Sequence, residues 1–224
     1  MKKSGSLLMV LAAALVMTAT CACAAEGGVA VSATAGTLGA GGEIAGRINP
    51  NLNARLGLAG FGDKFKSQVS GIDYEFKMKL LNGIALLDWF PFSSSGFRLS
   101  GGVVVNDNTY KVDATGSANY DVNGVTYSAA QVGTLSGKVE FNKVAPYAGL
   151  GWGNPFLAQG HWSLAVDIGA FYQGSPDVKL DASGPIASNP AFQANLDAER
   201  ANLEDKGDKF RFYPVAMVAV TYRF

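Results

Sequence analysis

The chain has 224 residues, with 18 Lys and Arg against 18 Asp and Glu, so its formal net charge is zero. This balance argues against nucleic acid as a partner, because nucleic-acid-binding proteins carry a basic patch or stripe. The two cysteines both lie within the first 25 residues, which leaves the rest without a thiol for a disulfide, a zinc site or a nucleophile. We therefore expect no metal and no other cofactor.

Residues 1–25 have the order of features of a secretory signal peptide. A basic Met-Lys-Lys start precedes an apolar run from Leu7 to about Met17, and small residues follow up to Ala24. The run is shorter than the roughly 20 residues that a membrane-spanning helix needs. Neither cysteine has a leucine three residues before it, which disfavours a lipoprotein signal. We expect cleavage near Ala24/Ala25.

Eight later segments alternate apolar and polar residues, as expected when successive side chains of a strand point to opposite faces. They are residues 29–35, 37–48, 52–62, 72–90, 97–107, 138–153, 162–174 and 210–224. The first is short for a tilted membrane strand of roughly 9–11 residues, but bacterial barrels have an even number of strands. We therefore count eight.

Two of these segments are irregular. The segment 72–90 becomes apolar on both faces in its second half. The segment 138–153 changes phase near Val144, which predicts a β-bulge at Pro146.

Short turns alternate with longer connections, which lie around residues 62–72, 107–136 and 174–208. In outer-membrane barrels, short turns face the periplasm and long loops face outside. Aromatic residues flank the short turns, as an interfacial ring would: Trp89, Phe92, Phe97, Trp152 and Trp162. A soluble β-sandwich would instead place its aromatics near strand centres.

The last segment, FRFYPVAMVAVTYRF, is apolar at every second position from Phe210 to Phe224. An exposed edge strand with such a face would aggregate, so something apolar must cover it. Lipid covers it if the strand closes a barrel. We predict an all-β fold: a transmembrane antiparallel up-and-down β-barrel with eight strands and one short helix in the last long loop. A soluble periplasmic or secreted β-domain is the alternative.

Three stretches carry a family resemblance: APYAGLGWGN, YQGSP and FYPVAMVAVTYRF. They resemble a poorly characterised group of small Gram-negative outer-membrane β-barrel proteins. The ending VTYRF, with Tyr222 and Phe224, resembles the signal read by the outer-membrane assembly machinery. The resemblance implies that residues 26–224 form an outer-membrane barrel whose partners are outer-membrane lipid and that machinery.

The polar faces, projected inward, predict a charged lumen. Its expected residues are Glu43, Arg47, Arg55, Lys77, Lys79, Arg98, Asp167 and Arg211. An eight-stranded barrel is just wide enough for side chains to fill it, and buried charges need partners. These points favour a structural or interaction barrel with a filled polar lumen over a narrow porin-like channel for small solutes.

Two loop motifs predict local structure. Asn189 is a good N-cap and Pro190 suits a first helical position, so we expect an amphipathic helix over residues 190–206, as a solvated surface helix or as a lid. Asn123 and Gly124 between β-favouring residues predict a tight hairpin outside the membrane.

One segment, GHWSLAVD, resembles the His-x-Ser pair of lipid A deacylase barrels. The resemblance would make His161 the general base and Ser163 the nucleophile, with Asp167 to orient the histidine. Ser163 alternates with apolar neighbours and so points to the lumen rather than to lipid, and no Glu follows near Ser175. We therefore expect the protein not to be an enzyme.

Overall fold

The computed structural model describes residues 28–69, 72–116 and 119–224. The expected signal peptide and its cleavage site lie outside these residues. Among the described residues, no helix combines the length and the hydrophobicity needed to cross a lipid bilayer.

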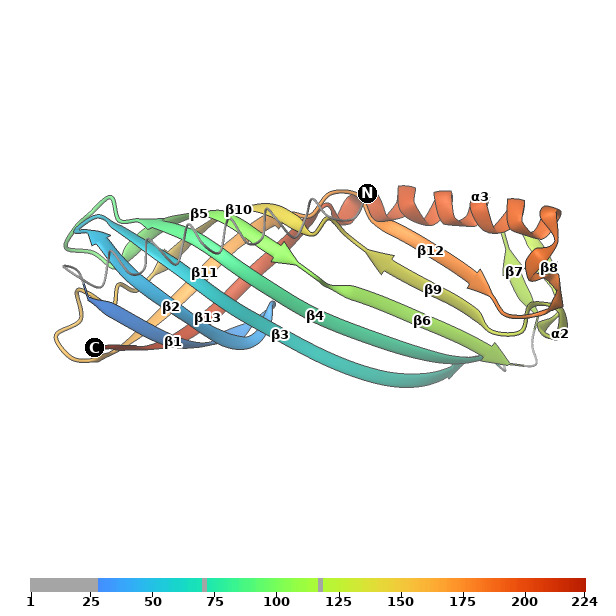
Figure 1. The fold of residues 1–224 in the computed structure, drawn as a ribbon, viewed down its shortest axis with the longest axis horizontal. Helices are drawn as coiled ribbons and strands as arrows, with labels where there is room; N and C mark the ends of the chain where they lie inside the picture. Colours follow the sequence, from blue (N-terminus) through green and yellow to red (C-terminus); the bar gives the residue numbers. More distant parts are fainter. Residues whose placement is uncertain (1–27, 70–71, 117–118) are drawn as a thin grey trace.

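Eight antiparallel strands form a closed ring (Figure 1). They are β1 (Val29–Gly36), β2 (Gly39–Asn49), β3 (Leu52–Val69), β4 (Ile72–Trp89), β5 (Phe97–Asn106), β10 (Val144–Trp152), β11 (Trp162–Tyr172) and β13 (Phe212–Arg223). Each strand pairs with the next, and β13 pairs with β1, which closes the ring without an edge. The predicted eight-stranded barrel is confirmed, and the short segment at 29–35 is its first strand.

A five-stranded sheet continues the barrel at one end, and we call it the extension. It contains residues 61–69 of β3, residues 72–79 of β4, and the strands β6 (Thr109–Gly116), β9 (Leu135–Glu140) and β12 (Asp177–Ala182). The strands pair in the order β3-β4-β6-β9-β12. The longer connections expected from the sequence are thus largely folded, and β3 and β4 pair without interruption from Leu52↔Trp89 to Val69↔Ile72.

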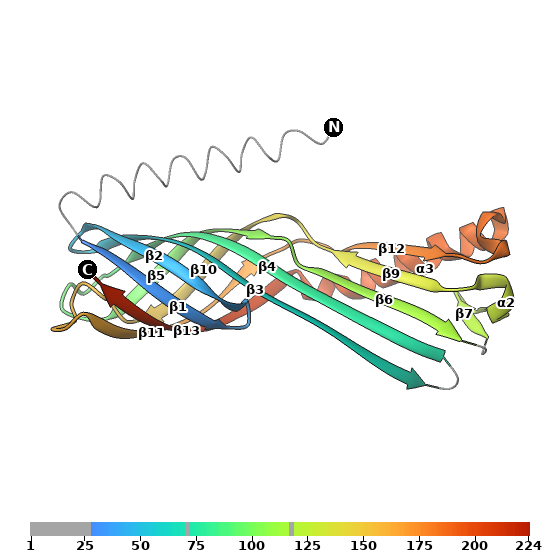
Figure 2. The same cartoon turned by 60° about the horizontal axis from the view of Figure 1, so that its bottom comes forward.

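Smaller elements cover the extension, and the last of them leads the chain back to the barrel rim. They are β7 (Tyr120–Val122), β8 (Val125–Tyr127), α2 (Ala129–Val132), η1 (Pro185–Ser188), α3 (Pro190–Gly207) and η2 (Asp208–Phe210). Figure 2 shows α3 beside β12, with the β3–β4 hairpin at the other edge of the sheet. Asn123 and Gly124 have φ of 53° and 75°, as a type I′ hairpin turn requires, so the predicted hairpin is confirmed.

The helix α3 confirms that residues 190–206 form a helix, but its buried residues are Phe192 and Leu196 alone and Leu203 is exposed, so the expected apolar stripe does not run along the whole helix. The Asn189 side-chain oxygen accepts hydrogen bonds from the backbone N–H groups of Ala191 at 2.9 Å and Phe192 at 3.3 Å. Phe192 and Leu196 are buried in a small core with the inner face of the extension. The cap therefore fixes where α3 starts, and these two side chains attach it to the sheet.

The outer face of the barrel is apolar, as the alternation of β13 predicts. Along this strand, Val218 is 58% exposed while its neighbour Met217 is 7% exposed. The same pattern on β11 exposes Leu164 and Ile168. An outward apolar band of this kind suits contact with lipid and not with water.

The bulge predicted at Pro146 is wrong. Pro146 pairs regularly with Val103 in an uninterrupted β5–β10 register. The phase change comes instead from residues 141–143, which separate β9 in the extension from β10 in the barrel. One alternating segment of the sequence is therefore two strands.

Candidate functional site

The candidate site is the barrel lumen, which contains a layer of charged side chains centred on Arg55. This guanidinium lies 3.2 Å from Glu43 Oε2, 2.7 Å from Asp88 Oδ2 and 3.0 Å from Asp167 Oδ2. The three carboxylates come from β2, β4 and β11. Arg55 on β3 thus binds carboxylates from its two neighbouring strands, β2 and β4, and from β11 across the ring.

Arg98 completes this charged layer. Its Nη2 donates to both carboxylate oxygens of Asp167 at 2.8 Å, and its Nη1 donates to the Gly153 carbonyl oxygen. The Ser100 hydroxyl donates to Asp88 Oδ1 at 2.5 Å. All five charged side chains are at most 8% exposed, and removing one partner would leave another charge buried without compensation.

The charged layer depends on a missing side chain at Gly151. A Cβ at this position would lie 2.7 Å from Arg98 Nε and 2.8 Å from Asp167 Oδ1. Both distances are well below van der Waals contact. The glycine therefore leaves the space in which this ion pair forms.

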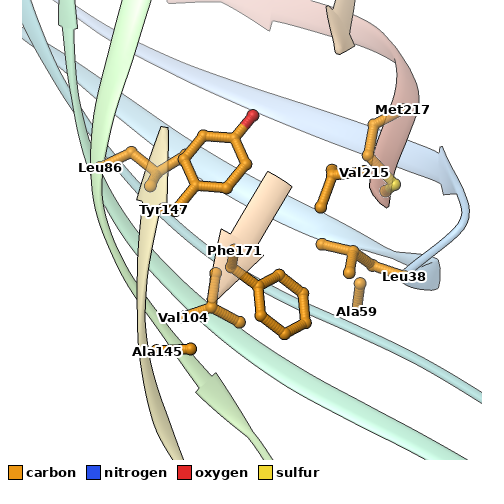
Figure 3. Packing of buried hydrophobic residues seen from close by; sticks show 9 residues of the cluster. All are labelled: Leu38, Ala59, Leu86, Val104, Ala145, Tyr147, Phe171, Val215 and Met217. Atoms are coloured by element: carbon orange, nitrogen blue, oxygen red, sulfur yellow. The ribbon is translucent and has the colours of Figure 1, made fainter. Parts of the chain in front are cut away.

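An apolar layer follows the charged layer along the lumen (Figure 3). Its buried members are Leu38, Ala59, Leu86, Val104, Ala145, Tyr147, Phe171, Val215 and Met217. Phe171 stacks on the half-buried Tyr213 with ring centroids 4.9 Å apart. Figure 3 shows these side chains converging from strands around the ring, so apolar groups occupy this level of the lumen.

Amide side chains form a third layer where the barrel meets the extension. Asn82 Nδ2 donates to Asn108 Oδ1 at 3.1 Å, and Asn106 Nδ2 donates to Gln173 Oε1 at 3.3 Å. Toward the extension, the inward-facing side chains of β4 follow in the order Asp88, Leu86 and Asn82. Those of β11 are Asp167 and Phe171, and Gln173 comes just after the strand. The charged, apolar and amide layers therefore follow each other along the barrel.

Two small cavities lie on either side of Arg55 and Glu43. One also touches Ser32 and Thr221, and the other touches Tyr147. Each has a volume of about 20 Å³, close to the 10–15 Å³ needed to hold one water molecule. The charged layer separates them.

The structure places some of the eight sequence-predicted lumen residues inside the barrel and others outside it. It brings together Glu43, Arg55, Arg98 and Asp167. Arg47 faces inward at the end of β2 and is partly exposed, and among the described residues no carboxylate lies within ion-pair distance of it. Three others are not in the lumen.

The expectation that Lys77, Lys79 and Arg211 line the lumen is wrong. Lys77 and Lys79 share the outward parity of Leu81 on the unbroken strand β4, and they lie in the extension. Lys77 binds Asp113 at 2.9 Å there. Arg211 lies at the barrel rim beside Asp208, just before β13.

Sequence reasoning missed Asp88 and the apolar layer. The segment around Asp88 is apolar on both faces, so the sequence pattern did not show which face points into the lumen. A sequence signal was available from parity, because Asp88 lies on the opposite face of the strand from Trp89, which was expected at the membrane interface. Successive side chains of a strand point to opposite faces, so Asp88 points inward when its neighbour Trp89 points outward.

The geometry does not assemble the deacylase-like set. His161 is exposed, its Nδ1 lies 2.9 Å from the Arg223 carbonyl oxygen, and its ring stacks on Tyr222. Ser163 faces Thr221 across the sheet. Asp167 is bound by Arg55 and Arg98. It lies six residues after His161, which at about 3.3 Å per residue separates the two by roughly 20 Å.

The expected interface aromatics lie at or beside ends of β4, β5, β10 and β11. Figure 1 shows these strand ends opposite the extension, on the side where the chain ends. Trp89, Phe92, Trp152 and Trp162 are each more than half exposed on the outer surface, and Phe97 is partly buried. Tyr172 and Phe212 form an exposed pair at the other end. Aromatics at both ends of an apolar band are typical of membrane interfaces.

Comparisons with known proteins agree with this architecture. No family model and no curated protein matches the sequence. Among solved structures, the chain is similar to Acinetobacter baumannii CarO, with a TM-score of 0.57, 25% identity, and coverage of 88% of this chain and 98% of that one. The chain is also similar to CarO2 from the same organism, with a TM-score of 0.60, 24% identity, and coverage of 88% of this chain and 98% of that one.

The protein is an integral outer-membrane β-barrel protein. A weaker likeness, with a TM-score of 0.45 and 15% identity over 89% of this chain and 100% of the other, is to a major outer membrane protein from Thermus thermophilus. The lipid-facing apolar band and the closed ring of strands give the physical reason why this barrel lies in a membrane.

Proposed function

We propose that this outer-membrane barrel is a structural or interaction protein whose filled lumen does not pass solutes. The observation that carries the proposal is the charged layer, in which Arg55 binds three carboxylates and Arg98 lies within ion-pair distance of two of them, Asp167 and Asp88. An eight-stranded barrel has room for little more than its own side chains.

The apolar layer and the amide layer, which lie between the charged layer and the extension, support the same function. Among the described side chains of the apolar layer and those packed against it, only Tyr147 and Tyr213 carry a hydroxyl group, and Tyr213 donates its hydroxyl to the Thr37 carbonyl oxygen. The amide side chains beyond this layer bind each other. A narrow porin-like channel needs a continuous polar path. The cavities of about 20 Å³ beside Arg55 are too small and too separated to provide one.

The ends of the chain belong to this proposal as well. Residues 1–25 act as a signal peptide that is cleaved near Ala24/Ala25, and residues 26–224 are the mature barrel. The last strand, with Tyr222 and Phe224, serves as the signal for the assembly machinery. In support, Phe224 is exposed and packs edge-on against Tyr222 at 5.1 Å. The extension then faces the outside of the cell.

Liposome swelling tests the proposal. The purified protein is inserted into vesicles, its insertion is verified by protease protection, and small neutral, cationic and anionic solutes are added in turn. We expect swelling no faster than in protein-free vesicles, while a sixteen-stranded porin as positive control swells rapidly. Swelling that rises with the amount of inserted protein would contradict the proposal.

A further inference from the structure

Five lysines lie directly opposite one another on the five strands of the extension. The pairs are Lys64↔Lys77, Lys77↔Lys111, Lys111↔Lys138 and Lys138↔Lys179. We call Lys64, Lys77, Lys111, Lys138 and Lys179 the lysine row. Like charges directly opposite in a sheet are destabilising, so the row has an electrostatic cost in the protein alone.

The acidic residues beside the row neutralise only part of it. Lys77 binds Asp113 at 2.9 Å and Glu75 at 3.4 Å. Lys138 binds Glu140 at 2.8 Å, and Lys179 binds Glu140 at 3.2 Å and Asp177 at 3.8 Å. Within the described ranges, Lys64 and Lys111 have no carboxylate within 4.0 Å, and both are exposed. The uncompensated positive charge is thus at the β3–β4–β6 side of the sheet.

The row lies on the face that continues the lipid-facing surface of the barrel. On β4, Lys77 is four positions from Leu81 and shares its outward parity. On the neighbouring strand, Lys64 is six positions from the exposed Leu58. At about 3.3 Å per residue and a strand tilt near 40°, four to six residues rise roughly 10–15 Å.

From this height, extended lysine side chains reach the headgroups of the leaflet on the extension's side. The polar region of a bilayer extends roughly 5–8 Å beyond its hydrocarbon core, and a lysine side chain reaches several ångströms along a surface. Adjacent strands are about 4.8 Å apart, so the row spans roughly 19 Å across the sheet. Because the strands tilt by about 40°, roughly 15 Å of this span lies along the membrane plane. It is therefore long enough to contact more than one lipid.

We propose that the lysine row binds anionic phosphate headgroups of lipids in the leaflet adjacent to the extension. The inference goes beyond the filled lumen, because it concerns the outer face and does not depend on whether the lumen conducts. Charge complementarity and continuity with the lipid-facing band both favour a lipid over a soluble anion.

Lipid retention tests the proposal. The folded protein is inserted into vesicles of phosphatidylcholine with a minor fraction of phosphatidylglycerol and extracted with mild detergent, and the bound lipids are measured by native mass spectrometry. We expect phosphatidylglycerol in excess of its share in the vesicle, and an excess that falls as salt is raised.

A double variant, Lys64→Ser with Lys111→Ser, removes the two uncompensated charges at exposed positions. We expect the excess to fall about five-fold for each lysine that contributes fully, since a lysine near an anionic surface adds about that factor in binding. The matched control, Arg200→Ser with Lys206→Ser, removes the same charge from the exposed face of α3 and should keep the excess.

Three results would overturn the proposal. One is the absence of a phosphatidylglycerol excess in the wild type, and another is an equal loss in both double variants. The third is binding of soluble tripolyphosphate in neutral vesicles without any lipid excess, which would assign the row to a soluble anion.

Discussion

Arg55 is the residue on which the charged layer depends, because three carboxylates contact it. We expect Arg55→Met to lower the free energy of unfolding by about 3–5 kcal/mol. Glu43 would lose its ion pair with Arg55, and Asp88 and Asp167 would keep Arg98 alone as a cationic partner among the described residues. Urea titration of the barrel in lipid vesicles measures this loss.

Arg47 provides the matched control. It faces the same lumen but is partly exposed, so Arg47→Met should change the unfolding free energy by no more than about 0.5 kcal/mol. If the two variants unfold at the same urea concentration, the charged layer does not stabilise the barrel as argued.

Gly151 gives a second prediction at this scale. A methyl group there meets Arg98 and Asp167 at less than 3 Å, so Gly151→Ala should cost about 1–3 kcal/mol through overpacking. The control is Gly101→Ala on the neighbouring strand, where the nearest atom to a new Cβ is 4.0 Å away. Thermal unfolding of both variants compares them, and a Gly151→Ala barrel as stable as Gly101→Ala would contradict the packing described.

The sequence predicts four charged-layer residues because alternation separates polar from apolar faces on β2, β3, β5 and β11. It fails for Asp88, where neither face is polar, and for Lys77 and Lys79. The strand β4 keeps one register over 18 residues. Lys77 therefore shares the outward face of Leu81, although its own neighbours suggest the reverse.

The helix α3 is attached to the extension by Phe192, which is 1% exposed and meets Tyr127 edge-on at 4.9 Å. We expect Phe192→Ala to weaken this local core by about 3–5 kcal/mol. Amide hydrogen exchange should accelerate in α3 and the β7–β8 hairpin and stay slow in the barrel strands. Leu203→Ala, at an exposed position of the same helix, should leave exchange unchanged. Slow exchange in both variants would show that Phe192 is not the anchor.

The outer face of the extension has a predictable pH dependence. Hydrogen bonds from the Ser136 hydroxyl and the Lys77 ammonium group hold the pKa of Asp113 below its ordinary value of 3.8. A carboxylate with a lowered pKa stabilises the folded form above its unfolded-state pKa, and this stability is lost as the pH falls through the folded-state pKa.

We therefore expect amide exchange in β6 and β9 to be constant from neutral pH down to about pH 4, once corrected for its intrinsic pH dependence, and to rise relative to barrel strands below that. Asp113→Asn should remove part of this rise. An equal rise in the variant would show that other groups cause it.

Local motifs predict the small elements of the extension, because an N-cap or an Asn-Gly turn acts within a few residues. The strands β6, β9 and β12 escape prediction because each has only six to eight residues and pairs with a distant part of the chain. Such short alternating stretches resemble polar loops until their partners are known.

At the scale of the whole molecule, the binary pattern inverts along the same continuous strands. In the barrel, apolar side chains such as Leu87 point outward and Asp88 points inward. In the extension, Phe76 lies on the inner face and Lys77 on the outer face. The surrounding solvent changes from lipid to water between these levels, so the outward side chains change from apolar to polar.

A filled lumen blocks the passage of ions, and single-channel conductance in a planar bilayer measures this property. We expect no conductance steps, at either sign of applied voltage, from protein whose insertion is verified independently. Discrete, reproducible steps that scale with the inserted protein would contradict it, and would show that the charged layer around Arg55 opens a path for ions.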